Sequence, residues 1–428
     1  MRIKKLLAAV LAGGILLNSG CSLQKDTGEY ENSIFVLNNT EGKLTELEFM
    51  EAEPVIVYVK PETVPNLIVD RYGYSKNDEL MAYVQGVQVP EQICVKEKKS
   101  QEIVYRGGLQ NVIFDEKTKK YFGEFSFLIP KEGTYFIQCE QLGKSYPFRV
   151  ENEIYKNLAE ELYTQITSAS EKDSGAVEEL LLLLLACEWH PGICEDKDGN
   201  GVPDVLDYIK VWIRDNDFTD MKDSKISLYA AFLAKYSYLY RQYDLTYATE
   251  CLHMASTIFV KTKNEKVKSA DQFFALTELY RATGLAVYGD QILEYQAVFR
   301  EKTEFYEEPS YLYGVMTYFL TRQEVDTSFC NMLMQKLLTC GETAAKECES
   351  LLESWRETTV DPDRLLYMTR QLSCANYVLE SMQYSRIMGD VMHYLMGRNP
   401  GSRVYYSEAD GAGMYFLLAA ELAALDGI

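Results

Sequence analysis

Oxygen-bearing side chains alternate along the segment from Asp196 to Asp207. Asp196, Asp198 and Asn200 are spaced two residues apart, Gly201 follows, and Asp207 closes the segment. This spacing is similar to a calcium loop, in which oxygen ligands alternate, a glycine makes the sharp turn and a carboxylate completes the ligand set. The alternative is a metal-free turn at Asn200 and Gly201 that leads into a helix beginning near Pro203. A structural calcium ion is therefore one of two interpretations, and no other cofactor is expected.

The N-terminus has the pattern of an export signal. A basic stretch in the first five residues precedes an apolar run, Leu6 to Leu17, that is too short to span a bilayer. Two small residues then precede Cys21, which resembles the lipid-attachment cysteine of bacterial lipoproteins. We expect residues 1–20 to be a signal peptide, Cys21 to carry the lipid, and residues 21–34 to form a polar tether. The protein would be exported and held at the bacterial cell surface by its lipid alone; the alternative is an ordinary secretory signal.

Composition limits the classes of function. The chain has 428 residues, which favours two domains, and 47% hydrophobic residues, which suffice for full cores. The net charge of −21 argues against nucleic acid as a partner, and against adhesion to anionic lipid through protein charge. Three histidines are too few for a histidine-rich metal or proton-relay site.

Ten cysteines in an exported chain permit disulfides. Cys94 and Cys139 both fall in the part of the chain that is rich in strand patterns, and they could pair. Most of the others lie in helix-like runs, where we expect them to pack as small buried apolar groups; they are Cys187, Cys251, Cys330 and Cys374.

The sequence pattern changes near residue 150. Residues 35–150 contain short strand-like runs punctuated by Gly, Pro and Asn-Asp, which is typical of an antiparallel sandwich. Residues 151–428 contain helix-like runs with no plausible strand, and Leu180 to Leu185 are apolar on every side of a helix. The eleven or twelve helices that we expect fit a double-ringed barrel of antiparallel helices; a helical solenoid is the alternative, although no fixed repeat is visible. The predicted fold is multidomain, a β-sandwich followed by this all-α barrel.

Several motifs, in order along the chain from Pro65 to Ile428, resemble glycoside hydrolase family 9. In that family of cellulases an immunoglobulin-like domain precedes an (α/α)6 barrel. The motifs are NLIVDRYGYS from Asn66, AVEELLLLLLACEW from Ala176, GNGVPDVLDYIKVWI from Gly199, SADQFFALTELYRATG from Ser269 and Gly-Arg-Asn-Pro at Gly397–Pro400. The resemblance implies the same two-domain fold and a polysaccharide or oligosaccharide of the β-1,4-glucan type as partner.

The resemblance implies inverting hydrolysis by two carboxyl groups, an Asp base and a Glu acid. One carboxylate activates water while the other, kept protonated, delivers a proton to the leaving oxygen. The family's base lies in an Asp-Ala-Gly-Asp segment, but the matching residues here, Ser168 to Val177, lack that pattern. Asp173 is the one Asp of this segment and the candidate base, with a solvated interhelical loop as the alternative.

The C-terminal end supplies the candidate acid. Glu408 matches the family's acid Glu at the start of the last helix; the alternative is a carboxylate that merely favours a helix N-terminus. The family's His-His-Arg loop is absent before it. We expect Arg398, Trp189 and Tyr406 to contact substrate, with Trp189 at the barrel mouth as a sugar platform or, alternatively, in the core.

Two functions are consistent with these residues. In the first, a cell-surface lipoprotein binds β-1,4-glucan-type polysaccharide or a protein partner and hydrolyses little or none of it, because the catalytic Asp motif is missing. In the second, the chain is an active inverting endo-β-1,4-glucanase that uses Glu408 as general acid.

Overall fold

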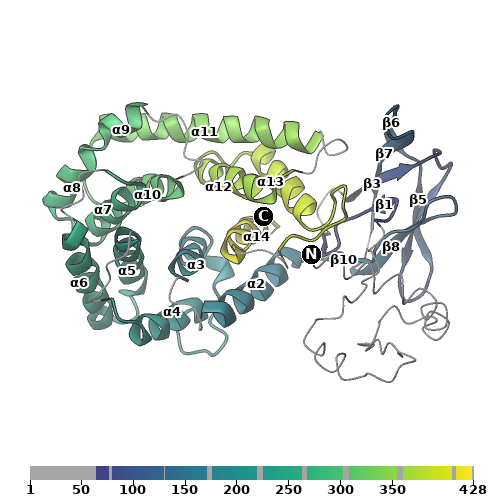
Figure 1. The fold of residues 1–428 in the computed structure, drawn as a ribbon. Coiled ribbons are helices and arrows are strands. Elements are labelled where there is room, and N and C mark those ends of the chain that lie inside the picture. Colours follow the sequence, from purple (N-terminus) through teal and green to yellow (C-terminus); the bar gives the residue numbers. More distant parts are fainter. Residues whose placement is uncertain are drawn as a thin grey trace, which may run out of the picture. The chain divides into compact units, whose positions relative to one another are not determined.

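The computed structural model describes most of the chain after Thr63. The described residues are 64–76, 80–129, 131–170, 176–218, 225–262, 268–301, 308–353, 360–406 and 411–426. Strands occupy the first part of this range and helices the rest (Figure 1). The predicted signal peptide, lipidation site and tether lie outside the described residues.

The strands form a sandwich of two sheets. The first sheet has the order β1 (Leu67–Ile68), β3 (Leu80–Gly86), β7 (Lys120–Phe127) and β6 (Gln110–Asp115). The second has the order β2 (Gly73–Ser75), β10 (Phe148–Glu151), β8 (Gly133–Cys139), β4 (Ile93–Glu97) and β5 (Ile103–Gly107), with β9 (Gly143–Lys144) paired to β8. The pairing is antiparallel except between β2 and β10.

The sandwich core follows from the alternation along its strands. In β7, for example, Phe125 and Phe127 point inward and their rings stack with centroids 5.6 Å apart. Tyr74 of β2 packs edge-on against Phe127, with ring centroids 6.0 Å apart, which closes the gap between the sheets. The predicted sandwich is confirmed for the described residues, and it also includes β6 and β9, whose exposed residues show no alternation of buried and exposed positions.

In the described part of the chain, six helices are buried around most of their circumference and form an inner ring. They are α3 (Val177–Trp189), α5 (Ile226–Tyr240), α7 (Ala270–Thr283), α10 (Pro309–Leu320), α12 (Pro362–Leu379) and α14 (Ala412–Asp426). Each contacts the next in this order, and α14 contacts α3, so the ring closes. The run Leu180–Leu185 of α3 is buried on all sides, as predicted. None of the helices that the structure describes is long and apolar enough to cross a membrane.

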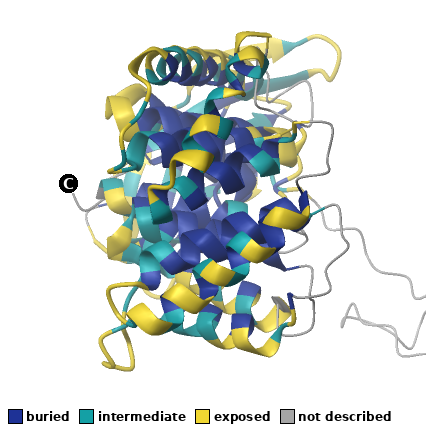
Figure 2. Ribbon diagram, turned by 90° about the vertical axis from the view of Figure 1, so that its left-hand side faces the viewer, coloured by how far each residue is buried: buried dark blue, intermediate teal, exposed yellow. Residues whose placement is uncertain are grey.

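The remaining helices lie outside this ring and bury one face each (Figures 1 and 2). They are α2 (Ile154–Ser170), α4 (Asp204–Asp215), α6 (Leu245–Lys261), α8 (Ala286–Leu293), α9 (Gln296–Glu301), α11 (Thr327–Glu353) and α13 (Met382–Leu395). In α4 the buried residues recur at helical spacing, at Val205, Ile209, Trp212 and Ile213. An inner and an outer ring of helices make an (α/α)6 barrel, which confirms the predicted fold class.

The sandwich packs on the barrel through the outer face of its four-stranded sheet. Tyr83 and Phe122, from β3 and β7, belong to the same buried cluster as the inner helices. The turn after β1 adds polar contacts, because Asp70 Oδ2 lies 2.8 Å from His393 Nδ1. The Arg71 backbone N–H also donates to the Met396 carbonyl oxygen at 2.8 Å. The two domains therefore form one compact unit from Val64 onward.

The described cysteines correct two expectations from the sequence. Cys187, at the end of α3, forms a disulfide with Cys194 and is not an isolated apolar group. Cys94 and Cys139 are both free. Cys94 of β4 lies directly opposite Gln138 of β8, so these two side chains are on the same face of the sheet. Cys139 follows Gln138 along β8, so its buried side chain is on the other face, and the two sulfurs lie on opposite faces of the sheet.

Candidate functional site

Inner and outer helices alternate along the chain, and each outer helix carries the chain back to the end where the previous inner helix began. All inner helices therefore begin at the same end of the barrel. We call this end the barrel mouth and define it by first-turn and capping residues of the inner helices. These are Glu178, Glu179, Lys225, Asp271, Ser310, Asp363 and Gly413. Acidic side chains predominate among them, and the positive ends of the helix dipoles point the same way.

Direct contacts between neighbouring helices hold the mouth together. The Lys225 Nζ atom lies 2.8 Å from Glu178 Oε1, which joins α5 to α3. Ser310 Oγ donates to Asp271 Oδ1 at 2.5 Å, which joins α10 to α7. Carboxyl groups are thereby held at one end of the barrel, an arrangement suited to general acid–base chemistry or to hydrogen bonds with sugar hydroxyls.

Asp271 is a carboxyl group whose protonated form is favoured by its surroundings. Ser269 caps α7 by accepting from the Gln272 backbone N–H at 3.2 Å, which places Asp271 in the first turn. Burial raises the pKa of Asp271, the hydrogen bond from Ser310 opposes this, and the nearby Glu178 carboxylate adds a further rise. A shift in this direction favours the protonated form, which is the form that a general acid needs. No sequence pattern singles out Asp271, because an acid in the first turn after a serine cap suits any helix.

Both predicted catalytic carboxyls, Asp173 and Glu408, lie outside the described residues. The segments that carry them lead directly into α3 and α14. These helix starts are joined at the mouth, where Glu179 Oε2 accepts a hydrogen bond of 2.5 Å from the Gly413 backbone N–H. The described ends of the two segments therefore adjoin.

Trp189 lies far from the mouth, which corrects the expectation of a sugar platform there. Helix α3 begins at the mouth and ends at Trp189. Twelve residues at the helical rise separate the two ends by about 18 Å. The Trp189 side chain is 5% exposed. The alternative interpretation, a core residue, fits this position.

Arg398 and Tyr406 face the contact between the two domains. Arg398 is 2% exposed, and its Nη2 atom donates to Asp390 Oδ1 at 2.6 Å. Tyr406 is half-buried and packs edge-on against Tyr72 of the sandwich, with ring centroids 6.1 Å apart. In this structure both side chains stabilise the domain contact, and a polysaccharide cannot reach Arg398 without a rearrangement.

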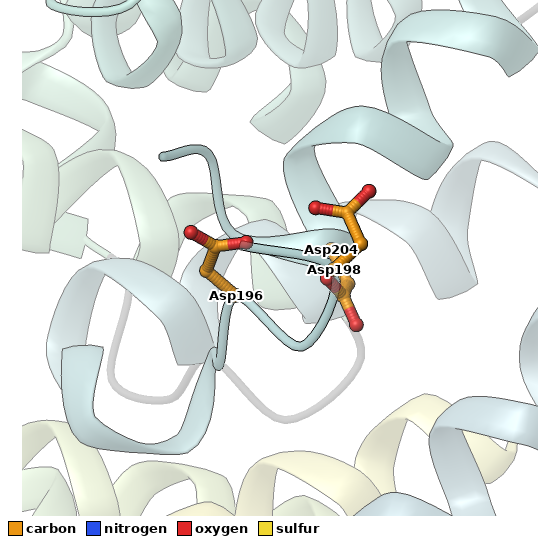
Figure 3. Close-up of side chains that lie close together, drawn as sticks. All are labelled: Asp196, Asp198 and Asp204. Carbon is orange, nitrogen blue, oxygen red and sulfur yellow. The ribbon is translucent and has the colours of Figure 1, made fainter. Parts of the chain in front are cut away.

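The loop before α4 brings acidic side chains together (Figure 3). One carboxylate oxygen each of Asp196, Asp198 and Asp204 lies within 4.8 Å of the others. The amide of Asn200 joins Asp207 to this trio, because Asn200 Nδ2 donates to Asp207 Oδ2 at 2.6 Å and to Asp198 Oδ2 at 3.0 Å. Asp204 is thus a further carboxylate beside the predicted residues Asp196, Asp198, Asn200 and Asp207.

The same loop also satisfies its own carboxylates. Backbone N–H groups of Gly199, Asn200 and Gly201 donate to Asp196 at 2.8, 3.1 and 2.8 Å. These hydrogen bonds, with Gly201 foremost, lower the pKa of Asp196. An all-oxygen donor set fits calcium better than a transition metal. The calcium ion stays a prediction, since a self-bonded acidic turn has the same geometry.

A known family model matches the first of the two domains. Residues 62–144 match the family model described as the cellulase N-terminal ig-like domain. No curated protein matches the chain. The sandwich is thus similar in sequence to a known family of immunoglobulin-like domains.

Solved structures match across both domains. A metagenome-derived glycoside hydrolase family 9 endoglucanase superposes with a TM-score of 0.65 at 16% identity, covering 79% of this chain and 84% of that one. A structure named Bacteroides ovatus GH9 gives 0.60 at 14% identity, with 84% and 99% covered. AaCel9A in complex with cellobiose-like isofagomine gives 0.62 at 14% identity, with 79% and 84% covered. The chain therefore has the fold of family 9 glycoside hydrolases with an N-terminal immunoglobulin-like domain.

Proposed function

We propose that this chain, which has the glycoside hydrolase family 9 fold, is a lipid-anchored cell-surface protein that binds β-1,4-glucan-type polysaccharide at its barrel mouth and hydrolyses it weakly or not at all. The observation that carries the proposal is the mouth itself. Carboxyl groups from several inner helices converge there, and a neighbour of the same fold is complexed with a cellobiose-like isofagomine.

Weak hydrolysis follows from the missing base. An inverting reaction without a positioned base must use unactivated water, and general acid–base assistance is commonly worth about 10² to 10⁴-fold. The segment Ser168 to Val177 has Asp173 as its one aspartate and no Asp-Ala-Gly-Asp pattern. Loss of the His-His-Arg loop also removes contacts that orient the sugar, and positioning supplies a large part of such rates.

The second candidate is an active inverting endo-β-1,4-glucanase. Two observations favour it: the helix starts that follow Asp173 and Glu408 adjoin, and the pKa of Asp271 is raised at the same mouth. In that case Glu408 is the general acid, or Asp271 takes over this role from α7, and Asp173 is the base.

Reducing-sugar release from carboxymethyl-cellulose separates the two candidates. We expect the purified mature chain to release sugar at a rate near the background without protein. The variants Asp173→Ala, Glu408→Gln and Asp271→Asn should differ little from it. Turnover at ordinary cellulase rates, abolished by any one of these substitutions, would establish the second candidate instead.

The lipid anchor is tested separately. The mature protein should begin at an acylated Cys21 and fractionate with the membrane, whereas Cys21→Ser should leave the protein unacylated and soluble in the extracellular or cell-wall fraction. Mass spectrometry of the N-terminal peptide gives the modification directly. Retention of the Cys21→Ser protein in the membrane fraction would show that the anchor lies elsewhere.

A further inference from the structure

A groove lies where the outer face of the four-stranded sheet meets helices α11 and α13. Its volume is about 470 Å³, within the range of ligand pockets, and it lies at a domain boundary where such pockets are common. We call it the seam groove and define it by Met81, Ile113, Phe122, Glu124, Glu353 and Ile387 among its lining residues. None of the mouth residues lines it.

The floor and one wall of the seam groove are apolar. Phe122 and Ile387 are buried at 7% and 1% exposure, so they close the floor against the interior of the protein. Ile113 of β6 stands on the wall with 48% of its surface exposed. An exposed large aliphatic side chain beside an apolar floor favours a ligand that has an apolar group of its own.

Some of the charges around the groove are neutralised within the protein. Glu349 accepts from Arg386 Nη2 at 3.4 Å, and Asp390 accepts from the buried Arg398 at 2.6 Å. Each of these two carboxylates therefore has a guanidinium partner.

The other two acidic side chains have no cationic partner among the described residues. Glu124, on the sheet side, accepts a hydrogen bond of 2.6 Å from the neutral amide of Asn111. Glu353, at the end of α11, has no cationic partner among the residues that the structure describes. One uncompensated carboxylate thus stands on each side of an apolar floor.

We propose that the seam groove binds a basic, extended peptide segment of a partner protein, in which an apolar residue is flanked by lysine or arginine. The apolar residue would lie against Ile113 and Phe122, and the two cations would reach Glu124 and Glu353. Lysine and arginine suit both the apolar floor and the two carboxylates, because their aliphatic stems cover apolar surface while the charged head stays in water.

A neutral glycan suits the seam groove less well. Sugar rings bind by stacking on exposed aromatic faces, but the aromatic side chains here, Tyr83 and Phe122, are only 6% and 7% exposed. Two uncompensated carboxylates have more to gain from cations than from hydroxyl groups. The proposed site is therefore separate from the glycan-binding mouth in both place and ligand chemistry.

Fluorescence anisotropy with a labelled hexapeptide of alternating lysine and leucine tests the proposal. Because the chain carries a charge of −21, such a probe also binds acidic surface without specificity, so the comparison must hold net charge constant. The groove variant is Glu124→Gln with Glu353→Gln, in which the new amide at position 124 can still accept a hydrogen bond from Asn111. The matched control is Glu250→Gln with Asp290→Asn, two exposed acids on α6 and α8.

The groove variant should raise the dissociation constant about three- to thirtyfold, as expected for two partly exposed charge pairs, and the control should stay within about twofold of wild type. Replacing leucine by serine in the probe, or Ile113→Ser in the protein, should also weaken binding. Equal effects of the two double variants, an unchanged affinity for the serine probe, or displacement of the probe by cellohexaose would each overturn the proposal. Equal melting temperatures of the variants confirm that they are folded.

Discussion

At the scale of single residues, the mouth carries a carboxyl group whose charged form the fold disfavours. Burial and the neighbouring Glu178 carboxylate raise the pKa of Asp271, although Ser310 donates a hydrogen bond to it. Such a group costs stability whenever it is ionised, and proteins tolerate this cost mainly at functional sites. Asp271 is thus a residue that stability alone does not explain.

This cost has a defined pH dependence. Because the folded-state pKa of Asp271 is raised, the penalty is absent below the unfolded pKa of about 3.9 and grows as the pH rises through the folded pKa. Asp271→Asn keeps an acceptor for Ser310 and removes the charge. We therefore expect this variant to melt at a higher temperature than wild type at pH 7 and at the same temperature near pH 4. A variant that melts lower at pH 7 would show that the ionised carboxylate stabilises the mouth.

At the scale of elements, buried charges tie three inner helices together. Lys235 of α5 forms an ion pair with Glu188 of α3, and its Nζ atom also lies 2.8 Å from Glu278 Oε1 of α7. Arg281 of α7 also pairs with Glu188. All four side chains are less than 10% exposed, so the loss of one cation leaves a carboxylate buried without full compensation.

Lys235→Met should therefore destabilise the barrel strongly, by about 3–5 kcal/mol. A matched control is Lys210→Met, in which the lost pair with Asp244 is partly exposed. Its effect should stay within about 1 kcal/mol. Thermal or urea unfolding measures both. Similar effects of the two substitutions would mean that the buried cluster contributes little to the packing of α3, α5 and α7.

The loop before α4 gives a second prediction for a local element. If the cluster of Asp196, Asp198 and Asp204 holds calcium, millimolar calcium should raise the melting temperature, since a ligand at a hundred times its dissociation constant stabilises by about 2.7 kcal/mol. Chelation should reverse the rise, and Asp198→Asn should reduce it. An unchanged melting temperature with calcium and with chelator would leave the metal-free turn as the correct interpretation.

The elements also show what the sequence could and could not predict. The inner helices were predictable, because runs such as Leu180–Leu185 are apolar on every side, and so were strands with clear alternation. Strand β6 was missed because its residues are exposed on both faces and show no alternation. Arg398 and Trp189 were predicted to contact substrate, but the structure buries both side chains. Their surroundings depend on how segments distant in the sequence pack together, and no local sequence pattern predicts that. Asp271 was missed because an acid in the first turn of a helix is common whether or not it has a function.

At the scale of the whole molecule, the contact between the domains depends on a close backbone approach. Gly397 has a φ of +120°, and a Cβ atom there would lie 2.9 Å from the Arg71 Cγ atom of the sandwich. Gly397→Ala should lower the melting temperature, because strain and a clash each cost about 1–3 kcal/mol.

A glycine on the neighbouring helix is the matched control. Gly389 of α13 has open space around its Cα hydrogen, and alanine is favoured over glycine in a helix by about 0.5–1 kcal/mol. Gly389→Ala should therefore leave the melting temperature unchanged or raise it. If calorimetry shows that Gly397→Ala melts like wild type, then the domain contact does not depend on this approach.

We propose that the barrel mouth binds β-1,4-glucan and that the chain turns it over weakly or not at all. Titration of the purified chain with cellohexaose, followed by chromatography of the recovered sugar, measures both halves in one sample. We expect saturable binding, weakened by Glu178→Ala with Asp271→Ala, and cellohexaose recovered intact. Absence of binding, or complete conversion to shorter oligosaccharides within the titration, would contradict the account.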